Sequence, residues 1–258
     1  MIFRDREHAG QMLAAKLHRR VPGEAVVLGV ARGGLPVAYQ VACSLEAALE
    51  PVVVRRIAAP GEPAVCVGAI AEGGAVTVNG RACRCLGLTE LDVADLARRE
   101  VVDLARRVRF YHGEEPPLDL TGRTAVVVDD GATTGASARA AGRAARARGA
   151  ASVVFAAPAI PALVQAELQE EFDDVVVLEV VPEHFAVSYC YQEFHRLRDE
   201  DALAYVHRAR GRGEAAQPQP AAAPSAQSRP PASPSSTSGA PPPIPPDRPP
   251  NPRRRPRP

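Results

Sequence analysis

The stretch from Ala125 to Ser137 reads A-V-V-V-D-D-G-A-T-T-G-A-S and joins a short apolar run to an Ala-rich segment. The β-branched run predicts a strand, and the Ala-rich segment predicts a helix. Between them lie turn-forming glycines and hydroxyl side chains suited to a helix start, namely Gly131, Gly135, Thr133, Thr134 and Ser137. Such a loop directs unpaired backbone N–H groups and the positive end of a helix dipole to one point, which predicts a phosphate site.

The two carboxylates that end the apolar run, Asp129 and Asp130, narrow the choice of ligand. Acids beside a phosphate would repel it unless the ligand also carries hydroxyl donors or a bridging divalent cation. A ribose 5-phosphate meets this demand, with its phosphate in the loop and its 2′ and 3′ hydroxyls on the two acids.

The sequence V-V-V-D-D-G-A-T-T-G-A-S resembles the phosphoribosyl diphosphate (PRPP) loop of type I phosphoribosyltransferases. The alternative interpretation is a strand, turn and helix with ordinary capping residues. The resemblance implies a contiguous set of PRPP-binding residues: Asp129, Asp130, Gly131, Ala132, Thr133, Thr134, Gly135, Ala136 and Ser137.

A second glycine turn, Ala31-Arg32-Gly33-Gly34, follows the apolar run from Ala25 to Val30. Its glycines permit close approach of backbone to a ligand, and the guanidinium of Arg32 suits phosphate oxygens. By resemblance, Arg32, Gly33 and Gly34 form the diphosphate loop with a catalytic role, and Arg56 is a further candidate where close relatives carry lysine. Taken alone, these residues could equally be a glycine turn and solvated arginines.

Apolar runs alternate with helical patterns along the chain, which predicts a mostly parallel sheet covered on both faces, a three-layer α/β/α fold. The resemblance implies the type I phosphoribosyltransferase fold. Expected helices are residues 6–20, 35–49, 88–111 and 159–171, and expected strands are 25–30, 51–56, 125–128, 152–157 and 175–181. The charged face of residues 88–111 predicts solvent exposure, with a subunit contact, and hence a homodimer, left open.

Two further segments gain a role only by resemblance. Residues 58–74 match the region of a mobile catalytic loop or hairpin, with Pro60, Gly61 and Glu62 as candidate members. The segment from Pro182 to Phe194 resembles the base-binding segment of purine phosphoribosyltransferases, which makes Phe185 the candidate that stacks on a base. The alternative for Phe185 is an ordinary core aromatic.

Over residues 2–208 the chain resembles bacterial phosphoribosyltransferase-like proteins through F-R-D-R-x-x-A-G, R-G-G-x-P-V-A and D-D-G-x-x-T-G-A-[ST]. It departs from the purine salvage enzymes at three points. Thr133 stands where they carry an acid, Gln192 stands where they carry a metal-holding aspartate, and Lys16 is the only lysine. Transfer to hypoxanthine or guanine is therefore not supported.

The resemblance implies a phosphoribosyltransferase that uses Mg²⁺ and PRPP and transfers the phosphoribosyl group to a nitrogenous acceptor, releasing diphosphate. The metal is expected on PRPP itself, with Asp129 and Asp130 as its candidate protein ligands. The alternative is a regulator that senses PRPP or a nucleotide on the same fold without turnover.

Composition divides the 258 residues into a body at 1–210 and a tail at 211–258 that holds most of the 26 prolines and seven arginines. Because the tail has few large apolar residues, we expect it to be disordered. The body is net negative, which argues against nucleic-acid binding. No run is long enough to span a membrane and the start lacks an export signal, so we expect a cytoplasmic protein. The pair Cys83 and Cys85 has no second pair, so no zinc site is expected.

Overall fold

The computed structural model describes residues 2–21, 24–183 and 185–216. A seven-stranded sheet with the order β4-β3-β2-β1-β5-β6-β7 forms its centre. The strands are β1 (Ala25–Ala31), β2 (Ala48–Ala59), β3 (Glu62–Ala71), β4 (Val76–Val78), β5 (Thr124–Val128), β6 (Ser152–Pro161) and β7 (Asp174–Val181). The helices are α1 (Arg6–Leu17), α2 (Gly34–Leu45), α3 (Gly80–Leu86), α4 (Glu90–His112), α5 (Ala136–Ala147), α6 (Ala162–Gln169) and α7 (Asp199–Ala216), with 3-10 turns at Glu72–Gly74 and Val187–Cys190.

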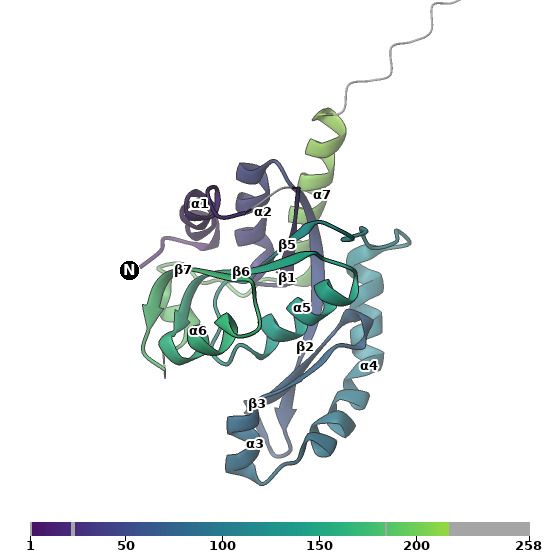
Figure 1. The fold of residues 1–258 in the computed structure, drawn as a ribbon, viewed down its shortest axis with the longest axis vertical. Coiled ribbons are helices and arrows are strands. Elements are labelled where there is room, and N and C mark those ends of the chain that lie inside the picture. The colour runs from purple at the N-terminus through teal and green to yellow at the C-terminus, as the bar shows by residue number, and fades with distance from the viewer. Residues whose placement is uncertain (1, 22–23, 184, 217–258) are drawn as a thin grey trace, which may run out of the picture. The chain divides into compact units, whose positions relative to one another are not determined.

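The predicted three-layer α/β/α fold is confirmed. Strands β2, β1, β5, β6 and β7 are parallel, and β3 and β4 extend the sheet in antiparallel fashion. Helices α1, α2 and α7 lie on one side of the sheet, and α5 and α6 lie on the other (Figure 1). Alternate side chains of β1 pack on opposite faces of the sheet. Val27 packs toward α1 and α2, whereas Val26 and Leu28 pack toward α5.

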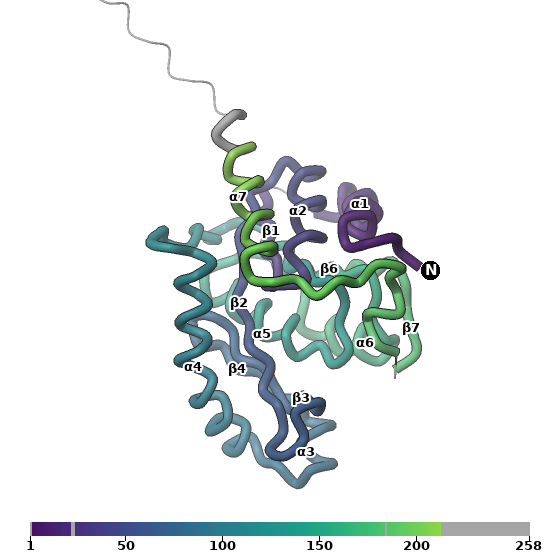
Figure 2. Tube along the Cα trace, turned by 180° about the vertical axis from the view of Figure 1, so that it is seen from behind, coloured from purple at the N-terminus to yellow at the C-terminus, as the bar shows by residue number. Residues whose placement is uncertain are grey.

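The long helix α4 runs beside the β2–β3 hairpin (Figure 2). Its start is fixed by a capping box in which Thr89 and Asp92 exchange hydrogen bonds, an arrangement that satisfies donors left unpaired at a helix start. The hairpin occupies the region expected to form a catalytic loop. Its tip includes Gly61 with φ of 78°, the left-handed conformation that favours glycine.

Three predicted helix boundaries are wrong. The helix expected at 6–20 ends at Leu17, and residues 18–20 form a turn. The helix expected at 35–49 ends at Leu45, because Glu46 adopts a left-handed conformation and Ala48 already begins β2. The helix expected at 159–171 begins at Ala162, because β6 continues through Pro161 beside β7. The sequence interpretation also lacked β4, α3 and α7; the first two are too short to show periodicity.

The predicted boundary between body and tail falls inside α7, which continues through Ala216, two residues before Pro218. Proline and the residue before it disfavour helix, which is consistent with this end. The rest of the expected tail, 217–258, lies outside the described residues. Within the described part of the chain, no helix combines the length and apolar character needed to cross a membrane.

Two helical glycines should respond in opposite ways to replacement by alanine. A Cβ at Gly142 in α5 would lie 2.6 Å from Cζ of Phe172, whose ring packs against Phe155, whereas a Cβ at Gly211 in α7 would meet nothing within 4 Å. Gly142→Ala should lower the free energy of unfolding by about 1–2 kcal/mol despite the better helix propensity of alanine. Gly211→Ala should raise it by up to about 1 kcal/mol. Urea unfolding checks both, and equal signs would contradict the tight packing of α5.

Candidate functional site

The two loops singled out from the sequence lie next to each other at the carboxyl ends of β1 and β5. These strands are paired in parallel, with Gly29 opposite Val128, so the loops that follow them emerge at the same edge of the sheet. The strand order also reverses here, because the chain passes from β1 to β2 on one side and returns to β5 on the other. In open α/β sheets, ligands bind at such a reversal point.

Close contact between the two loops explains the glycine pair. The backbone of Gly33 lies directly against the carboxylate of Asp130, and a Cβ at Gly34 would lie 2.5 Å from the carbonyl oxygen of Val128. Any side chain at either position would separate the loops. Gly34 therefore holds α2 against β5, and it lines neither of the pockets described below.

The adjacent acids are held by neighbouring groups. One carboxylate oxygen of Asp130 accepts a hydrogen bond from Nε of Arg6 at 2.7 Å, and its carbonyl accepts one from the Tyr191 hydroxyl at 2.7 Å. Oδ1 of Asp129 accepts the backbone N–H of Asp130 at 2.9 Å. Burial raises the pKa of Asp129 well above its usual value, and the charge of Asp130 raises it further. Hydroxyl donors or a cation would stabilise the charged forms of these two carboxylates.

The loop after the acids surrounds a pocket of about 360 Å³. Gly135 has φ of 67° and stands at the start of α5, where it makes no side-chain cap hydrogen bond. The N–H of Ala136 donates to Oγ1 of Thr134 at a long 3.4 Å, and the start of the helix faces the pocket. All predicted loop residues line this pocket, in the order Asp129, Asp130, Gly131, Ala132, Thr133, Thr134, Gly135, Ala136 and Ser137. Arg56 joins them from β2.

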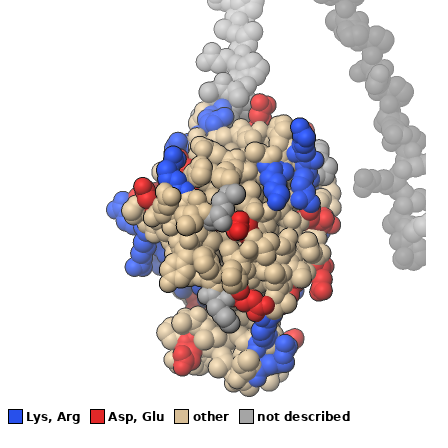
Figure 3. Space-filling model, turned by 90° about the vertical axis from the view of Figure 1, so that its left-hand side faces the viewer, with Lys and Arg blue, Asp and Glu red and all other residues tan. Residues whose placement is uncertain are grey.

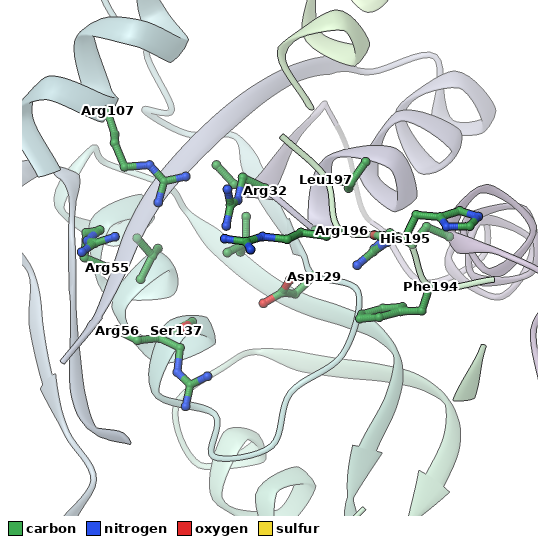
Figure 4. Close-up of a pocket in the computed structure, with 15 residues that line it drawn as sticks. Arg32, Arg55, Arg56, Arg107, Asp129, Ser137, Phe194, His195, Arg196 and Leu197 are labelled. Atoms are coloured by element: carbon green, nitrogen blue, oxygen red, sulfur yellow. Dashed lines mark hydrogen bonds between the residues drawn. The ribbon is translucent and has the colours of Figure 1, made fainter. Parts of the chain in front are cut away.

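A second pocket of about 510 Å³ adjoins the first, because Arg56, Asp129, Ser137 and Phe194 line both. Arg32 and Gly33 also line the larger pocket, so the structure brings the two predicted loops and Arg56 to one place. Figure 4 shows arginine side chains entering this pocket from several elements. Its six lining arginines are Arg6, Arg32, Arg55, Arg56, Arg107 and Arg196.

Four of these arginines and the segment 194–197 were missed as site residues from the sequence. Arg6 lies within the F-R-D-R stretch, and that motif was a usable signal. Arg55 precedes the predicted Arg56 on the same strand. Arg107 was assigned to the solvated face of its helix, yet it lines the pocket with its side chain 13% exposed. Arg196 belongs to a segment without periodicity.

The segment 191–197, here called the strap, is fixed by the beginning of the chain. Phe3 is fully buried and forms a parallel bridge with Tyr191, its N–H donates to the Cys190 carbonyl at 2.7 Å, and its carbonyl accepts the N–H of Gln192 at 2.8 Å. The guanidinium of Arg6 lies 3.8 Å above the Phe194 ring. One wall of the pocket is therefore built from both ends of the domain.

Acids outside the pocket position two of its arginines. Asp199 accepts from Nη2 of Arg107 and from the Tyr111 hydroxyl, each at 2.7 Å, and Arg55 pairs with Glu100 at 2.8 Å. Although burial opposes it, these hydrogen bonds and the nearby positive charges lower the pKa of Asp199. The guanidinium groups of Arg107 and Arg55 are thus held in fixed orientations by these acids.

Phe185, the predicted base-stacking residue, lines neither pocket. Its ring meets Tyr189 edge to face at 5.5 Å and packs in a small apolar cluster. Phe194 is the aromatic side chain that both pockets share. Stacking by Phe185 stays a prediction, and Phe194 is the better-placed ring.

A buried cluster at the other end of β2 contains Glu50, Glu72 and His112, whose nearest ligand atoms lie within 4.8 Å of one another. Arg148 already occupies it: Nη2 lies 2.7 Å from Oε1 of Glu50, and Glu72 also contacts the ring of His112 at 2.9 Å. A resident guanidinium supplies the counter-charge that a metal would supply. We assign no metal to this cluster.

Acidic and basic side chains are interspersed on the face shown in Figure 3. That face, which lies on the α1, β7 and α6 side, carries no single field of one sign.

Comparisons with known proteins agree with this geometry. A family model described as phosphoribosyl transferase domain matches residues 4–193. Two Mycobacterium tuberculosis proteins, from strains CDC 1551 / Oshkosh and H37Rv, bear names that give phosphoribosyl transferase as a provisional activity. Each is 39% identical over 208 residues, which is 81% of this chain and 47% of the relative, so the chain spans about half their length. A crystal structure of a Thermus thermophilus protein superposes with a TM-score of 0.66 at 36% identity, covering 80% of this chain and 98% of that one.

Proposed function

The chain belongs to the phosphoribosyl transferase domain family, and on that premise we propose that it binds Mg-PRPP and transfers the phosphoribosyl group to a nitrogenous acceptor, releasing diphosphate. One observation carries the proposal. The loop suited to a ribose 5-phosphate and the loop suited to a diphosphate lie side by side and line two adjoining pockets.

The smaller pocket would hold the 5-phosphate of PRPP on backbone N–H groups of residues 131–137 other than that of Ala132, which donates to the Ala159 carbonyl at 3.3 Å. Asp129 lines both pockets and Asp130 lines the smaller one, and the two acids would accept hydrogen bonds from the ribose hydroxyls. The diphosphate would extend into the larger pocket beside Arg32 and the N–H of Gly33. Arg56, on the border of both pockets, would contact the ligand between its two phosphate ends.

Mg²⁺ fits this site as a companion of PRPP. Asp129 and Asp130 offer carboxylate oxygens, the ligand type that Mg²⁺ prefers, but Arg6 already binds Asp130. Because Mg²⁺ commonly keeps few protein ligands in phosphate sites, PRPP oxygens would supply most of its coordination. When bound, the metal offsets charge on the diphosphate.

The residues of the larger pocket would assist cleavage of the bond between C1 of the ribose and the diphosphate oxygen. As the C1–O bond breaks, the electron pair leaves with the diphosphate, and Arg32 with the N–H of Gly33 would stabilise that charge. The two acids would hold the ribose so that the acceptor nitrogen attacks C1 from the opposite side. Thr133 stands at the loop position where purine enzymes carry an acid, so that position supplies no group to take the proton from the acceptor.

A direct test is calorimetric titration with Mg-PRPP, followed by a screen for diphosphate release against nitrogenous bases and amines. We expect saturable binding at one site per chain and diphosphate release with at least one acceptor. Absence of Mg-PRPP binding would contradict the proposal at its first step.

A regulator that senses PRPP or a nucleotide is the second candidate. Thr133 and Gln192, which stand where purine enzymes carry acids, favour it. Tight Mg-PRPP binding without diphosphate release across the acceptor panel would select this alternative over transfer.

A further inference from the structure

The outward side of α4 carries much of the exposed apolar surface of the protein. Both views place this helix at the periphery of the molecule, beside the β2–β3 hairpin (Figures 1 and 2). Four of the nine exposed large hydrophobic side chains among the described residues lie on it, namely Leu91, Val101, Val102 and Phe110. Leu91 is 77% exposed and Val102 is 79% exposed. Scattered exposed apolar residues are ordinary, but a concentration of them on one helix marks a candidate interface.

The exposed charges of α4 are segregated along its length. The first turns of the helix expose acids, and the middle and last turns expose arginines. The acids are Glu90, Asp92 and Asp95, and the arginines are Arg98, Arg99, Arg106 and Arg109. A surface with this polarity is complementary to an antiparallel copy of itself, because reversal of one helix brings the acidic end of each copy beside the basic end of the other.

Three residues on the outward side define the register of such a pair. Asp95, Val102 and Arg109 follow one another at intervals of seven positions, about two helical turns, and therefore lie on one face. A two-fold axis at Val102 brings this side chain against its own copy and sets Asp95 of each chain opposite Arg109 of the other. Within the described ranges the guanidinium of Arg109 forms no ion pair, so this contact would supply its counter-charge.

The same register brings Arg98 of one copy near Arg106 of the other. Each of these arginines already has an acidic neighbour on its own helix. Arg98 pairs with Asp95, and Arg106 pairs with Asp103 at 2.6 Å. These acids offset the repulsion between the two guanidinium groups, so the register is electrostatically consistent along its length.

We propose that two copies of the chain associate through their α4 helices, which pair in antiparallel orientation about a two-fold axis at Val102. The valines at the centre would be removed from water, and the charged residues would form the rim. The inner side of the same helix carries Arg107 into the larger pocket and Glu100 against Arg55. Each copy would therefore support from outside a helix that forms part of the other copy's site. The interface does not depend on the proposed transfer reaction.

Sedimentation equilibrium of the full chain measures this association. We expect a monomer–dimer equilibrium, and Val102→Glu should raise the dimer Kd by at least about tenfold because two carboxylates would meet at the axis. Val180→Glu is the matched control, because Val180 is 50% exposed on β7 at the far edge of the sheet, and it should leave the dimer Kd unchanged. Circular dichroism and thermal unfolding verify that both variants fold.

A charge exchange tests the polarity of the pair. Asp95→Arg should raise the dimer Kd several-fold, because it places two arginines opposite each other at both ends of the interface. Combining Asp95→Arg with Arg109→Asp in the same chain restores opposite charges across the interface, and the dimer Kd should return toward that of the unmodified chain.

Cysteine variants test the register in a Cys85→Ser background, because Cys85 is the exposed cysteine among the described residues. Val102→Cys should form a disulfide-linked dimer under mild oxidation, since the axis would bring the two copies of residue 102 within the Cα separation of about 7 Å that a disulfide allows. Leu91→Cys is similarly exposed but should not cross-link, because its two copies would lie about 33 Å apart along the helices.

Three results would overturn the proposal. The first is an unmodified chain that stays monomeric at the highest concentration reached. The second is a dimer whose Kd is the same in Val102→Glu, which would place the contact elsewhere on the molecule. The third is equally efficient disulfide formation by Leu91→Cys and Val102→Cys, which is incompatible with a two-fold axis at Val102.

Discussion

Gly135→Val should lower the affinity for Mg-PRPP by more than about 100-fold, which corresponds to about 2.8 kcal/mol. Gly135 has φ of 67°, and a β-branched residue is a severe misfit in that conformation. Its Cβ would also stand 3.2 Å from Val164 and 3.3 Å from Leu168, so the loop would have to move away from α6. The N–H groups that converge on the phosphate would then diverge. Calorimetry with Mg-PRPP measures the loss.

Gly122→Val is the matched control for this variant. Gly122 has φ of 74° and nothing within 4 Å of an added Cβ, and it precedes β5 at the opposite end of that strand. It should suffer similar backbone strain, about 1–2 kcal/mol of stability, without loss of Mg-PRPP affinity. Gly135→Ala gives a milder change if the valine variant fails to fold. Normal affinity in a folded Gly135 variant would contradict the phosphate role of the loop.

Replacing Asp129 and Asp130 together by asparagine should weaken Mg-PRPP binding by about 100-fold. Each carboxylate is proposed to accept a charge-assisted hydrogen bond from a ribose hydroxyl, and such bonds contribute about 1.5 kcal/mol or more apiece. Asp119→Asn makes a change of charge in the loop before β5, away from both pockets, and should leave the affinity unaltered. Unchanged affinity in the double variant would contradict the ribose role.

The single variant Asp129→Asn tests the electrostatics of the pair. Burial and the neighbouring Asp130 raise the pKa of Asp129, so its charged form is disfavoured in the folded protein. Ligand hydroxyls or Mg²⁺ favour the charged form, so binding should release protons and weaken as the pH falls through the raised pKa. Calorimetry in buffers of different ionisation enthalpy measures that release, which Asp129→Asn should abolish.

The folding stability of Asp129→Asn should not fall along with its affinity for Mg-PRPP. A carboxyl whose pKa is raised on folding lowers the free energy of unfolding at pH values above its unfolded pKa. Asp129→Asn should therefore keep or raise the melting temperature while it reduces Mg-PRPP affinity. A variant that lost both would indicate a structural role for Asp129 in joining the loops.

The centre of the fold was predictable because its signals are local. The run before Asp129 is apolar and β-branched, and the loop after it contains its own glycines. A series of such strand–loop–helix units along the chain predicts a mostly parallel sheet. The end of α2 was misjudged because Ala48 and Leu49 suit a helix as well as a strand, and only pairing with β1 decides between them. Tertiary contact overrode local propensity there.

The rest of the candidate site depends on contacts between distant segments. Arg6 reaches Asp130 across 124 positions, and Arg107 is turned into the pocket by Asp199, 92 positions away. Local periodicity assigns Arg107 to a charged helix face, because a helix pattern cannot show which part of that face a later segment will cover. Local sequence likewise could not show that Phe194 lines both pockets, because its position depends on contacts of the strap with distant residues.

The bridge between Phe3 and Tyr191 sets the order in which the site can be completed during synthesis. Phe3 is synthesised before every strand of the sheet, but its partners at 190–192 emerge only after all of these strands. A nascent chain that stops before this point could already contain both glycine loops, yet it would lack the wall bearing Phe194 and Arg196. The growing chain should therefore become able to bind an acceptor only after the segment around 190–197 has been synthesised.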